Sequence, residues 1–240
     1  MHAELWPAFI LHSRQLGEDK LILQLLLPEQ GRISAVVRKR QGKQRLALQP
    51  FQQFMLQLSG RNELKTVKSI DEAAAAFLFS GKVLYSGIYL NELICRLWPD
   101  NLAAEQLFNL YQHSLQQLML VQQGSGELEP CLREFEFALL TELGQPIDWQ
   151  QDADGNPLNT AWCYQWQHEQ GFVAAVNGFA GMHLLNIGNG QWQSADTRRC
   201  AKQLSRQILA PLLGSKPLAS RALLRALSNA VLCTDMVFPL

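Results

Sequence analysis

The first 70 residues hold five short apolar segments that are separated by tight turns. The segments span residues 8–13, 20–27, 32–38, 50–60 and 64–70. Gly17, Gly31 and Gly60 lie in three of the turns, where glycine is favoured because it adopts left-handed backbone conformations freely. The last segment breaks strict alternation, so its register stays open. Five strands in so short a span expose sheet edges unless the sheet closes, and we therefore expect a small barrel of the OB-fold type.

From about residue 73 the apolar residues recur at helical spacing. A stripe of Leu84, Ile88, Leu93 and Leu97, with Leu90 off the stripe, predicts a helix that Pro99 ends. Further helices are expected over 102–123 (with Asn101 as its cap), 129–144, 196–214 and 217–232, with a short hairpin formed by 161–167 and 171–176. The predicted class is α+β: an N-terminal OB-fold β-barrel at residues 1–78, then an α-helical domain at 79–240 with a loop and hairpin insertion at 150–177.

Composition is that of an ordinary folded protein, with 48% hydrophobic and 18% charged residues. The sequence has no apolar run near the ~18–20 residues that cross a bilayer, and its start carries no basic leader region. We therefore expect a cytoplasmic protein. The five cysteines are scattered without a CxxC pair. We therefore expect them to pack as small apolar side chains and not to bind a metal.

Patterns for catalysis are absent from the sequence. There is no GxxxxGK[ST] motif for a nucleotide phosphate, and the five histidines form no HExxH or HxxxH pair. The stretch 152–156, DADGN, begins like a calcium loop, but its glycine falls at the fourth position and Cys163 stands where the last ligand belongs. We expect no enzyme activity, no catalytic residues, no metal and no cofactor.

The net charge of zero hides a polarity along the chain. Residues 1–80 hold eleven Lys or Arg against seven Asp or Glu, whereas residues 81–240 hold ten against fourteen. Residues 32–68 contain one anion, Glu63, and nine cations: Arg32, Arg38, Lys39, Arg40, Lys43, Arg45, Arg61, Lys65 and Lys68. Such a cluster is either a solvated surface or a site for a polyanion.

Three phenylalanines, Phe9, Phe51 and Phe54, are interleaved with these cations. On an OB barrel, cations and aromatic platforms together bind single-stranded nucleic acid, because every base offers a face for stacking. Barrel cores also contain phenylalanine at alternate positions, so the three rings have two possible places. The cations are predicted to contact phosphates in either case.

Several stretches together resemble the RecO family of bacterial recombination mediators over essentially the whole chain. They are FILHSR, GRISAVVRKRQGK, ALQPF, GRNELKTVKS, LYSGIYLNELICRL, LREFEFALLTELG and GSKPLASRALLR, in that order. The resemblance implies an OB-fold joined to a helical domain, in a protein that is associated with the nucleoid. It also implies a protein that binds single- and double-stranded DNA, anneals complementary strands and, with RecR, loads RecA onto DNA coated by single-stranded-DNA-binding protein. An RNA-binding or ribosome-associated OB protein is the alternative that the charge pattern alone allows.

Many members of this family carry paired CxxC motifs that bind zinc, and this sequence departs from them. Its corresponding region, 150–177, has Cys163 alone, so it resembles the zinc-free branch. The hairpin is then expected to be held by its aromatic residues, which are Trp162, Tyr164, Trp166 and Phe172.

The resemblance also implies a site on the helical domain for the acidic tail of the single-stranded-DNA-binding protein. Arg133, Phe137 and Leu140 recur at i, i+4 and i+7 and share one helix face. Such a tail needs an apolar slot with a cation at its rim, and Lys216 or Arg221 can add a second cation. The alternative is that Phe137 and Leu140 belong to the core, and Glu134 and Glu136 nearby are unfavourable for an acidic ligand.

We expect the purified protein to contain no stoichiometric zinc, because the sequence offers no four-ligand set at usable spacing. Elemental analysis of the protein purified without chelators measures this directly. A content near one zinc per chain would contradict the assignment to the zinc-free branch.

Overall fold

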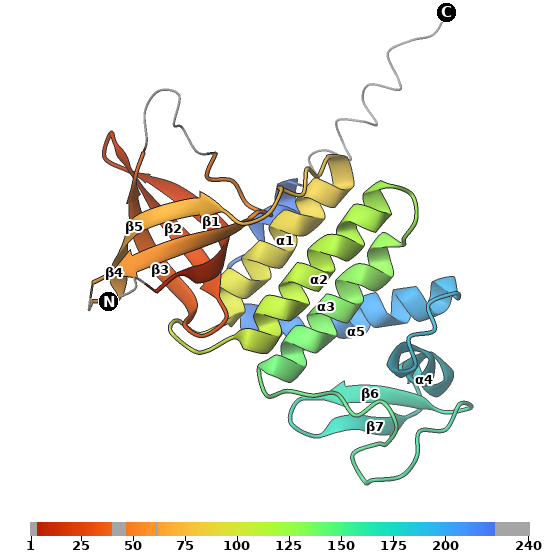
Figure 1. Cartoon of the computed structure of the whole chain (residues 1–240). Helices are drawn as coiled ribbons and strands as arrows, with labels where there is room; N and C mark the ends of the chain where they lie inside the picture. Colours follow the sequence, from red (N-terminus) through yellow and green to blue (C-terminus); the bar gives the residue numbers. More distant parts are fainter. Residues whose placement is uncertain (1–3, 40–46, 61, 224–240) are drawn as a thin grey trace, which may run out of the picture. The chain divides into compact units, whose positions relative to one another are not determined.

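Five strands form the N-terminal part of the chain (Figure 1). The structure, a computed structural model, describes residues 4–39, 47–60 and 62–223. The strands are β1 (Trp6–Leu16), β2 (Lys20–Leu27), β3 (Gly31–Arg38), β4 (Gln53–Ser59) and β5 (Leu64–Glu72). They close into a barrel in the order β1-β2-β3-β5-β4, and β1 pairs with β4. β3 and β5 run parallel to each other, whereas the other pairs are antiparallel. The predicted OB-type barrel is confirmed.

One face of each strand fills the barrel interior. Leu23 and Leu25 of β2 are fully buried and lie opposite Ala35 and Ile33 of β3. The other buried core residues of the barrel are Ala8, Ile10, Leu27, Val37, Phe54, Leu56 and Ile70. Because side chains alternate along a strand, the residues between these positions point away from the interior.

A bulge in β5 explains why its sequence does not alternate strictly. The pairing with β4 passes from Leu58–Val67 to Gln57–Ser69, so that Lys68 has no partner across β4. An extra residue of this kind shifts the side-chain pattern by one position. Val67 and Ile70 consequently both contact the core although three positions separate them.

A second bulge interrupts β1 and fastens a helix to the barrel. The pairing with β2 passes from Ile10–Leu25 to His12–Gln24, which leaves Leu11 outside the ladder. The Leu11 carbonyl accepts a hydrogen bond from Asn91 Nδ2 at 2.8 Å, and Tyr111 Oη donates to Asn91 Oδ1 at 2.6 Å. Asn91 and Tyr111 are both buried. The backbone group that the bulge frees is thus satisfied by a side chain, as a buried carbonyl requires.

Helices α1 (Gly81–Leu97) and α2 (Glu105–Gln122) carry these two side chains. The buried face of α1 includes Val83, Gly87, Leu90 and Ile94. Of the predicted stripe, Leu93 is buried, whereas Leu84, Ile88 and Leu97 are half-buried. The prediction that Leu90 lies off the stripe is wrong, because Leu90 is fully buried. A Cβ at Gly87 would lie 2.9 Å from the ring of Phe51, so glycine is needed for this close approach.

The loop between α1 and α2 packs on the start of β3. Gly31 has φ of +67°, and a Cβ there would meet the carbonyl oxygen of Leu102 at 1.7 Å. The amide of Asn101 donates to the carbonyl of Arg32 at 3.0 Å. The prediction that Asn101 caps the next helix is wrong, because α2 begins at Glu105 and Ala104 holds the cap position. Asn101 instead adopts a left-handed backbone, φ +59°, which lets the loop follow the strand.

Packing divides the described residues between two compact units. The barrel unit contains the described residues within 4–126 and 217–223, and the helical unit is Glu127–Lys216. Contacts therefore group α1 and α2 with the strands, although the sequence changes character near residue 78.

The helical unit contains α3 (Leu128–Glu142), a small sheet, α4 (Gly181–Gly188) and α5 (Ala195–Leu213). The sheet has the order β7-β6-β8, from β6 (Cys163–Gln167), β7 (Gly171–Ala175) and β8 (Phe179–Ala180). The predicted hairpin is present as β6 and β7, whereas β8 and α4 were not predicted. The α+β class with a small sheet among helices is confirmed.

Aromatic contacts hold the hairpin against the rest of the helical unit. The ring of Trp166 lies 5.2 Å from Phe172, Trp149 lies 6.0 Å from Phe172, and Phe137 lies 5.0 Å from Trp149. Tyr164 is fully buried and accepts a hydrogen bond from the amide of Asn159 at 2.8 Å. Trp162 was expected to join this group, but its side chain is 54% exposed.

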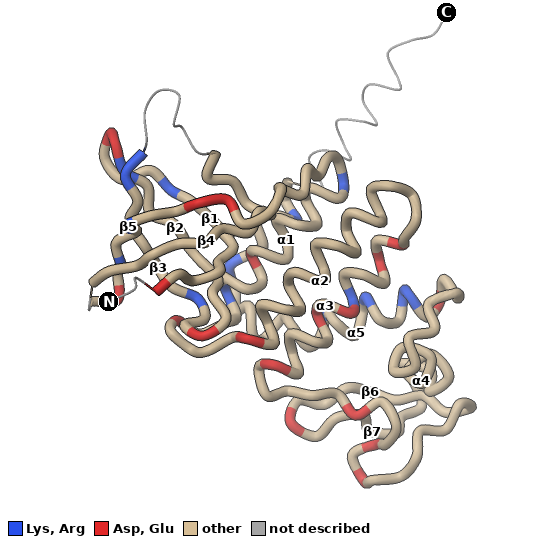
Figure 2. The backbone as a smooth tube through the Cα atoms, viewed as in Figure 1, with Lys and Arg blue, Asp and Glu red and all other residues tan. Residues whose placement is uncertain are grey.

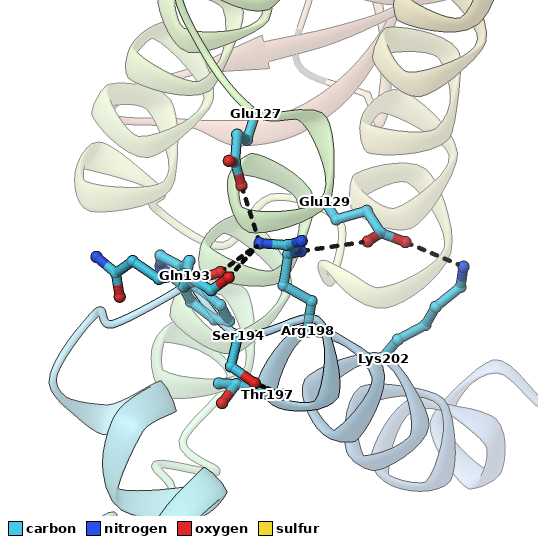
Figure 3. A network of polar contacts seen from close by, with 8 residues as sticks. Glu127, Glu129, Gln193, Ser194, Thr197, Arg198 and Lys202 are labelled. Atoms are coloured by element: carbon cyan, nitrogen blue, oxygen red, sulfur yellow. Dashed lines mark hydrogen bonds and ion pairs between the residues drawn. The ribbon is translucent and has the colours of Figure 1, made fainter.

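A polar network joins the start of α3 to α5 (Figure 3). Arg198 forms ion pairs with Glu127 at 3.4 Å and Glu129 at 3.9 Å, and Lys202 pairs with Glu129 at 3.3 Å. Ser194 caps α5 by accepting from the amide of Thr197. The acidic residues stand at the positive end of the α3 dipole, which strengthens an otherwise solvent-screened set of pairs.

We expect Asn91→Ala to lower the free energy of unfolding by about 1–3 kcal/mol, because it leaves the buried Leu11 carbonyl and the Tyr111 hydroxyl without partners. Urea denaturation of the two proteins measures the difference. Asn109→Ala, at an exposed position on α2, is the control and should be neutral or slightly stabilising. Equal midpoints for the Asn91→Ala variant and the wild-type protein would contradict this role.

Candidate nucleic-acid interface

The outer surface of β1, β2 and β3 has two parts with different surroundings. In one part Phe9, Leu26 and Arg32 lie side by side, as the pairings Phe9–Leu26 and Leu26–Arg32 show. The ring of Phe9 lies 5.0 Å from the rings of both Phe108 and Tyr111 on α2. Phe9 and Leu26 are therefore buried under the helices of the barrel unit. This part of the barrel surface cannot receive a ligand.

Arg32 belongs to the covered part and has a structural role. Its Nε donates to the carbonyl of Trp98 at 3.0 Å, and its Nη2 pairs with Asp100 at 3.0 Å. The side chain is 17% exposed. Asp100 compensates its charge. Arg32, which the sequence placed among the DNA-contacting cations, is therefore not an exposed cation.

The other part of the outer surface carries exposed side chains around the buried Ile22, and we call it the open face. Arg14 lies opposite Ile22, which lies opposite Val36, and Val36 lies opposite Thr66 on β5. One step along, Leu16, Lys20 and Arg38 stand in line in the same way. The open face consists of His12, Arg14, Leu16, Lys20, Ile22, Gln24, Ser34, Val36, Arg38, Leu64, Thr66 and Lys68.

Four cations are exposed on the open face, namely Arg14, Lys20, Arg38 and Lys68. Figure 2 shows lysine and arginine positions on several strands of the barrel. The bulge in β1 helps to create this surface, because beyond it Ser13 and Gln15 lie opposite the inward-facing Leu23 and Leu21. Arg14 therefore points outwards.

Arg38 and Lys39 make exposed contacts that a ligand can replace. Arg38 Nε lies 3.2 Å from Asp19 Oδ2, with side chains 76% and 49% exposed. Lys39 Nζ donates to Gln15 Oε1 at 2.6 Å. An exposed pair of this kind contributes little free energy, so a phosphate can compete with Asp19 for the guanidinium.

The remaining predicted cations differ in their availability. Lys65 is half-buried and its Nζ donates to the carbonyl of Gly60 at 3.3 Å, whereas Lys68 is exposed at the β5 bulge. Arg40, Lys43, Arg45 and Arg61 lie outside the described residues. Arg14 and Lys20 were not predicted as site residues, although their positions on either side of the Gly17 turn, in paired strands, were a usable signal.

The three interleaved phenylalanines are core residues. Phe9, Phe51 and Phe54 are 1%, 3% and 0% exposed. Phe51 packs on Phe79 with ring centroids 5.2 Å apart. Only Phe54 belongs to the barrel interior. Phe9 is buried between the outer surface of β1 and α2, and Phe51 packs near Gly87 of α1, so none of the three rings is available to bases.

The residues predicted for an acidic tail do not form one surface. Arg133 lies 2.6 Å from Glu136, and their side chains are 9% and 0% exposed. Glu136 also accepts a hydrogen bond from Ser205 of α5. Leu140 is fully buried, and Phe137 packs on Trp149. Phe137 and Leu140 therefore lie in the core of the helical unit, and Arg133 compensates a buried carboxylate.

The motif GSKPLASR anchors a C-terminal segment within the barrel unit. Glu92 of α1 accepts hydrogen bonds from the amides of Ala219 and Ser220 at 2.8 and 2.9 Å and from the Ser220 hydroxyl at 2.6 Å. Burial acts to raise the pKa of Glu92, but these hydrogen bonds and the charge of Arg96 outweigh it and lower the pKa. Arg221 lies over the ring of Tyr89, 5.5 Å from its centroid. Lys216, assigned to the helical unit, is exposed.

Three cysteines behave as inert apolar side chains. Burial raises the pKa of Cys131 and Cys200 to about 12 and that of Cys95 to about 11. These thiols are protonated at neutral pH and are poor nucleophiles and metal ligands. Within the described part of the chain, no group of three or more His, Cys, Asp and Glu side chains is placed to hold a metal ion.

Comparison with known proteins agrees with this architecture. Residues 1–75 match the family model for the recombination protein O N-terminal domain, and residues 78–222 match that for its C-terminal domain. The chain belongs to the RecO family. A protein of Cellvibrio japonicus named DNA repair protein RecO is 41% identical over 234 residues, which cover 93% of this chain and 97% of the relative.

Other RecO relatives are similar over nearly the same span. The DNA repair protein RecO of Klebsiella pneumoniae is 39% identical over 226 residues, covering 91% of each chain. That of Escherichia coli K12 is 38% identical over 226 residues, covering 91% of this chain and 92% of the relative. Among the residues that the structure describes, no helix is both long and apolar enough to cross a membrane.

We expect Arg133→Met to lower the free energy of unfolding by about 3–5 kcal/mol, because it leaves the Glu136 carboxylate buried without its cation. Arg199→Met is a matched control: Arg199 pairs with Asp196 at 2.6 Å with the same i,i+3 spacing, but both side chains are more than half exposed. That change should stay within about 0.5 kcal/mol. Thermal and urea unfolding measure both. Unchanged stability together with weaker binding of an acidic tail peptide would return Arg133 to the predicted tail site.

Proposed function

We propose that this RecO-family protein acts in DNA repair and homologous recombination by binding DNA on the open face of its barrel and annealing complementary strands. The observation that carries the proposal is the set of four exposed cations, Arg14, Lys20, Arg38 and Lys68, on one surface of an OB-type barrel. The relatives, which are similar over more than nine tenths of the chain, are named DNA repair proteins.

The chemistry of the open face suits a phosphate backbone. Each cation that neutralises a phosphate releases condensed counterions, which is the main source of sequence-independent affinity for DNA. The ion pair of Arg38 with Asp19 is exposed, so exchanging the carboxylate for a phosphate costs little. Single and double strands both present phosphates, and the proposal therefore includes both as ligands.

Annealing requires no catalytic residue. Base pairing is spontaneous once two strands are close together and their mutual repulsion is screened, and a cationic surface supplies both conditions. The inert state of Cys95, Cys131 and Cys200 fits a protein that works by binding. We accordingly propose a mediator that does not turn over a substrate.

The protein partners in the proposal follow from family membership. We propose that the protein acts with RecR to load RecA onto DNA coated by single-stranded-DNA-binding protein, whose acidic tail it contacts through the helical unit. Of the residues predicted for that contact, Arg133 and Leu140 are buried, whereas Lys216 is exposed. Lys216 is therefore the residue of this set that is best placed to meet a carboxylate.

We expect the variant with Arg14, Lys20, Arg38 and Lys68 all changed to Gln to bind DNA more weakly and with less salt dependence. Losing four phosphate contacts should make the slope of log K against log salt less negative by about 3 on single strands. Fluorescence anisotropy across a salt series measures the slope, and the rate at which complementary oligonucleotides pair measures annealing.

The control variant carries Arg206→Gln and Lys216→Gln, which remove exposed cations of the helical unit. It should keep the salt slope and annealing rate of the wild-type protein. If the fourfold variant kept them too, DNA binding on the open face would be refuted. If the protein bound RNA but did not accelerate DNA annealing, the alternative of an RNA-binding OB protein would take its place.

A further inference from the structure

We propose that the open face binds DNA through the sugar-phosphate backbone alone and leaves the bases unstacked and free to pair. The inference rests on the proposed function and specifies which part of the DNA the site recognises. It follows from what the open face presents and from what it lacks.

Aromatic platforms are missing from the open face. All aromatic residues of the barrel unit within residues 4–39, 47–60 and 62–126 are buried or half-buried. Phe54 lies in the barrel interior, against which the half-buried Trp6 packs. Phe9 and Phe51 are buried against α2 and Phe79. His12 is the one ring that the described part of the face exposes, and a single ring cannot stack successive bases.

The polar groups of the face are also poorly suited to reading base edges. Gln24 Nε2 donates to Ser34 Oγ at 2.8 Å, so these two side chains satisfy each other. Leu16 and Leu64 are 39% and 45% exposed, and as aliphatic side chains they offer no planar surface. The polar groups that remain are the four cations, His12 and Thr66. Cations bind phosphate wherever the bases point.

Leaving the bases free has a direct consequence for annealing. OB domains that stack bases hold the faces that must be released before two strands can pair, and each stacked base adds to that barrier. A strand held only by its phosphates presents its bases to a second strand without this cost. The duplex that results offers the same phosphates, so the face does not discriminate strongly between the substrate and the product of annealing.

The first experiment compares a single-stranded DNA oligomer with an oligomer of equal length built from abasic sites, by anisotropy with the full chain. We expect dissociation constants within about threefold of each other. Stacking would give the base-containing oligomer about a fivefold advantage or more for each stacked base. An advantage of tenfold or more, in a binding reaction that still depends on the four cations, would overturn the inference.

The second experiment adds a platform where the face has none. Leu64 lies outward on β5 opposite Ser34, and Leu64→Tyr places a ring among the cations. This variant should prefer the base-containing oligomer by about fivefold or more and should anneal complementary strands more slowly than the wild-type protein. Leu120→Tyr, at an exposed position on α2, is the control and should change neither. Unaltered preference and annealing in the Leu64→Tyr variant would count against the inference.

The outcomes separate this inference from the proposed function. If neither oligomer binds, or if the fourfold glutamine variant binds as tightly as the wild-type protein, the DNA-binding site itself is wrong. If binding depends on salt and is weakened in the fourfold glutamine variant, but the abasic oligomer binds poorly, the open face binds DNA and also stacks its bases.

Discussion

The hydrogen bond from Asn91 to the carbonyl of Leu11 connects the features on which the candidate site depends. The bulge at Leu11 takes one backbone carbonyl out of the β1–β2 ladder, and Asn91, held by Tyr111, satisfies it. The same bulge changes which β1 side chains face outwards. Before it, Phe9 packs under α2, and after it, Arg14 stands on the open face. One irregularity therefore sets both where α1 attaches to β1 and which side of β1 carries Arg14.

The barrel unit uses its charged residues in two distinct ways, which exposure separates. Arg32 is nearly covered and pairs with Asp100, and Glu92 anchors the segment at Ser220, so both charges serve the fold. Arg38 lies on the same strand as Arg32, but its pair with Asp19 is open to solvent. A charge that is already compensated in a covered position cannot be given up to a ligand without a large cost, whereas an exposed pair exchanges readily.

The helical unit repeats this distinction. The buried pair of Arg133 and Glu136 holds α3 against Ser205 of α5, and the exposed network of Arg198 and Glu127 joins the same helices at the surface. Sequence spacing alone placed Arg133 on a face with Phe137 and Leu140, which is correct for the helix. Whether that face met solvent or another helix depended on α5, which follows more than fifty residues later in the sequence.

The sequence by itself determined the barrel, its five strands, the hairpin and the family, because alternation, turn glycines and helical spacing are local properties that neighbouring residues encode. It also located the excess of cations in the N-terminal third of the chain. Only the tertiary structure decided which cations are exposed to solvent. Arg32 is largely covered and pairs with Asp100, whereas Arg14 and Lys20, which were not predicted as site residues, are exposed. The tertiary structure decided likewise that Phe9, Phe51 and Phe54 are buried and that Leu90 belongs to the buried face of α1. These outcomes depend on bulges and on contacts between distant segments, and a shift of one residue in a strand reverses which face a side chain occupies.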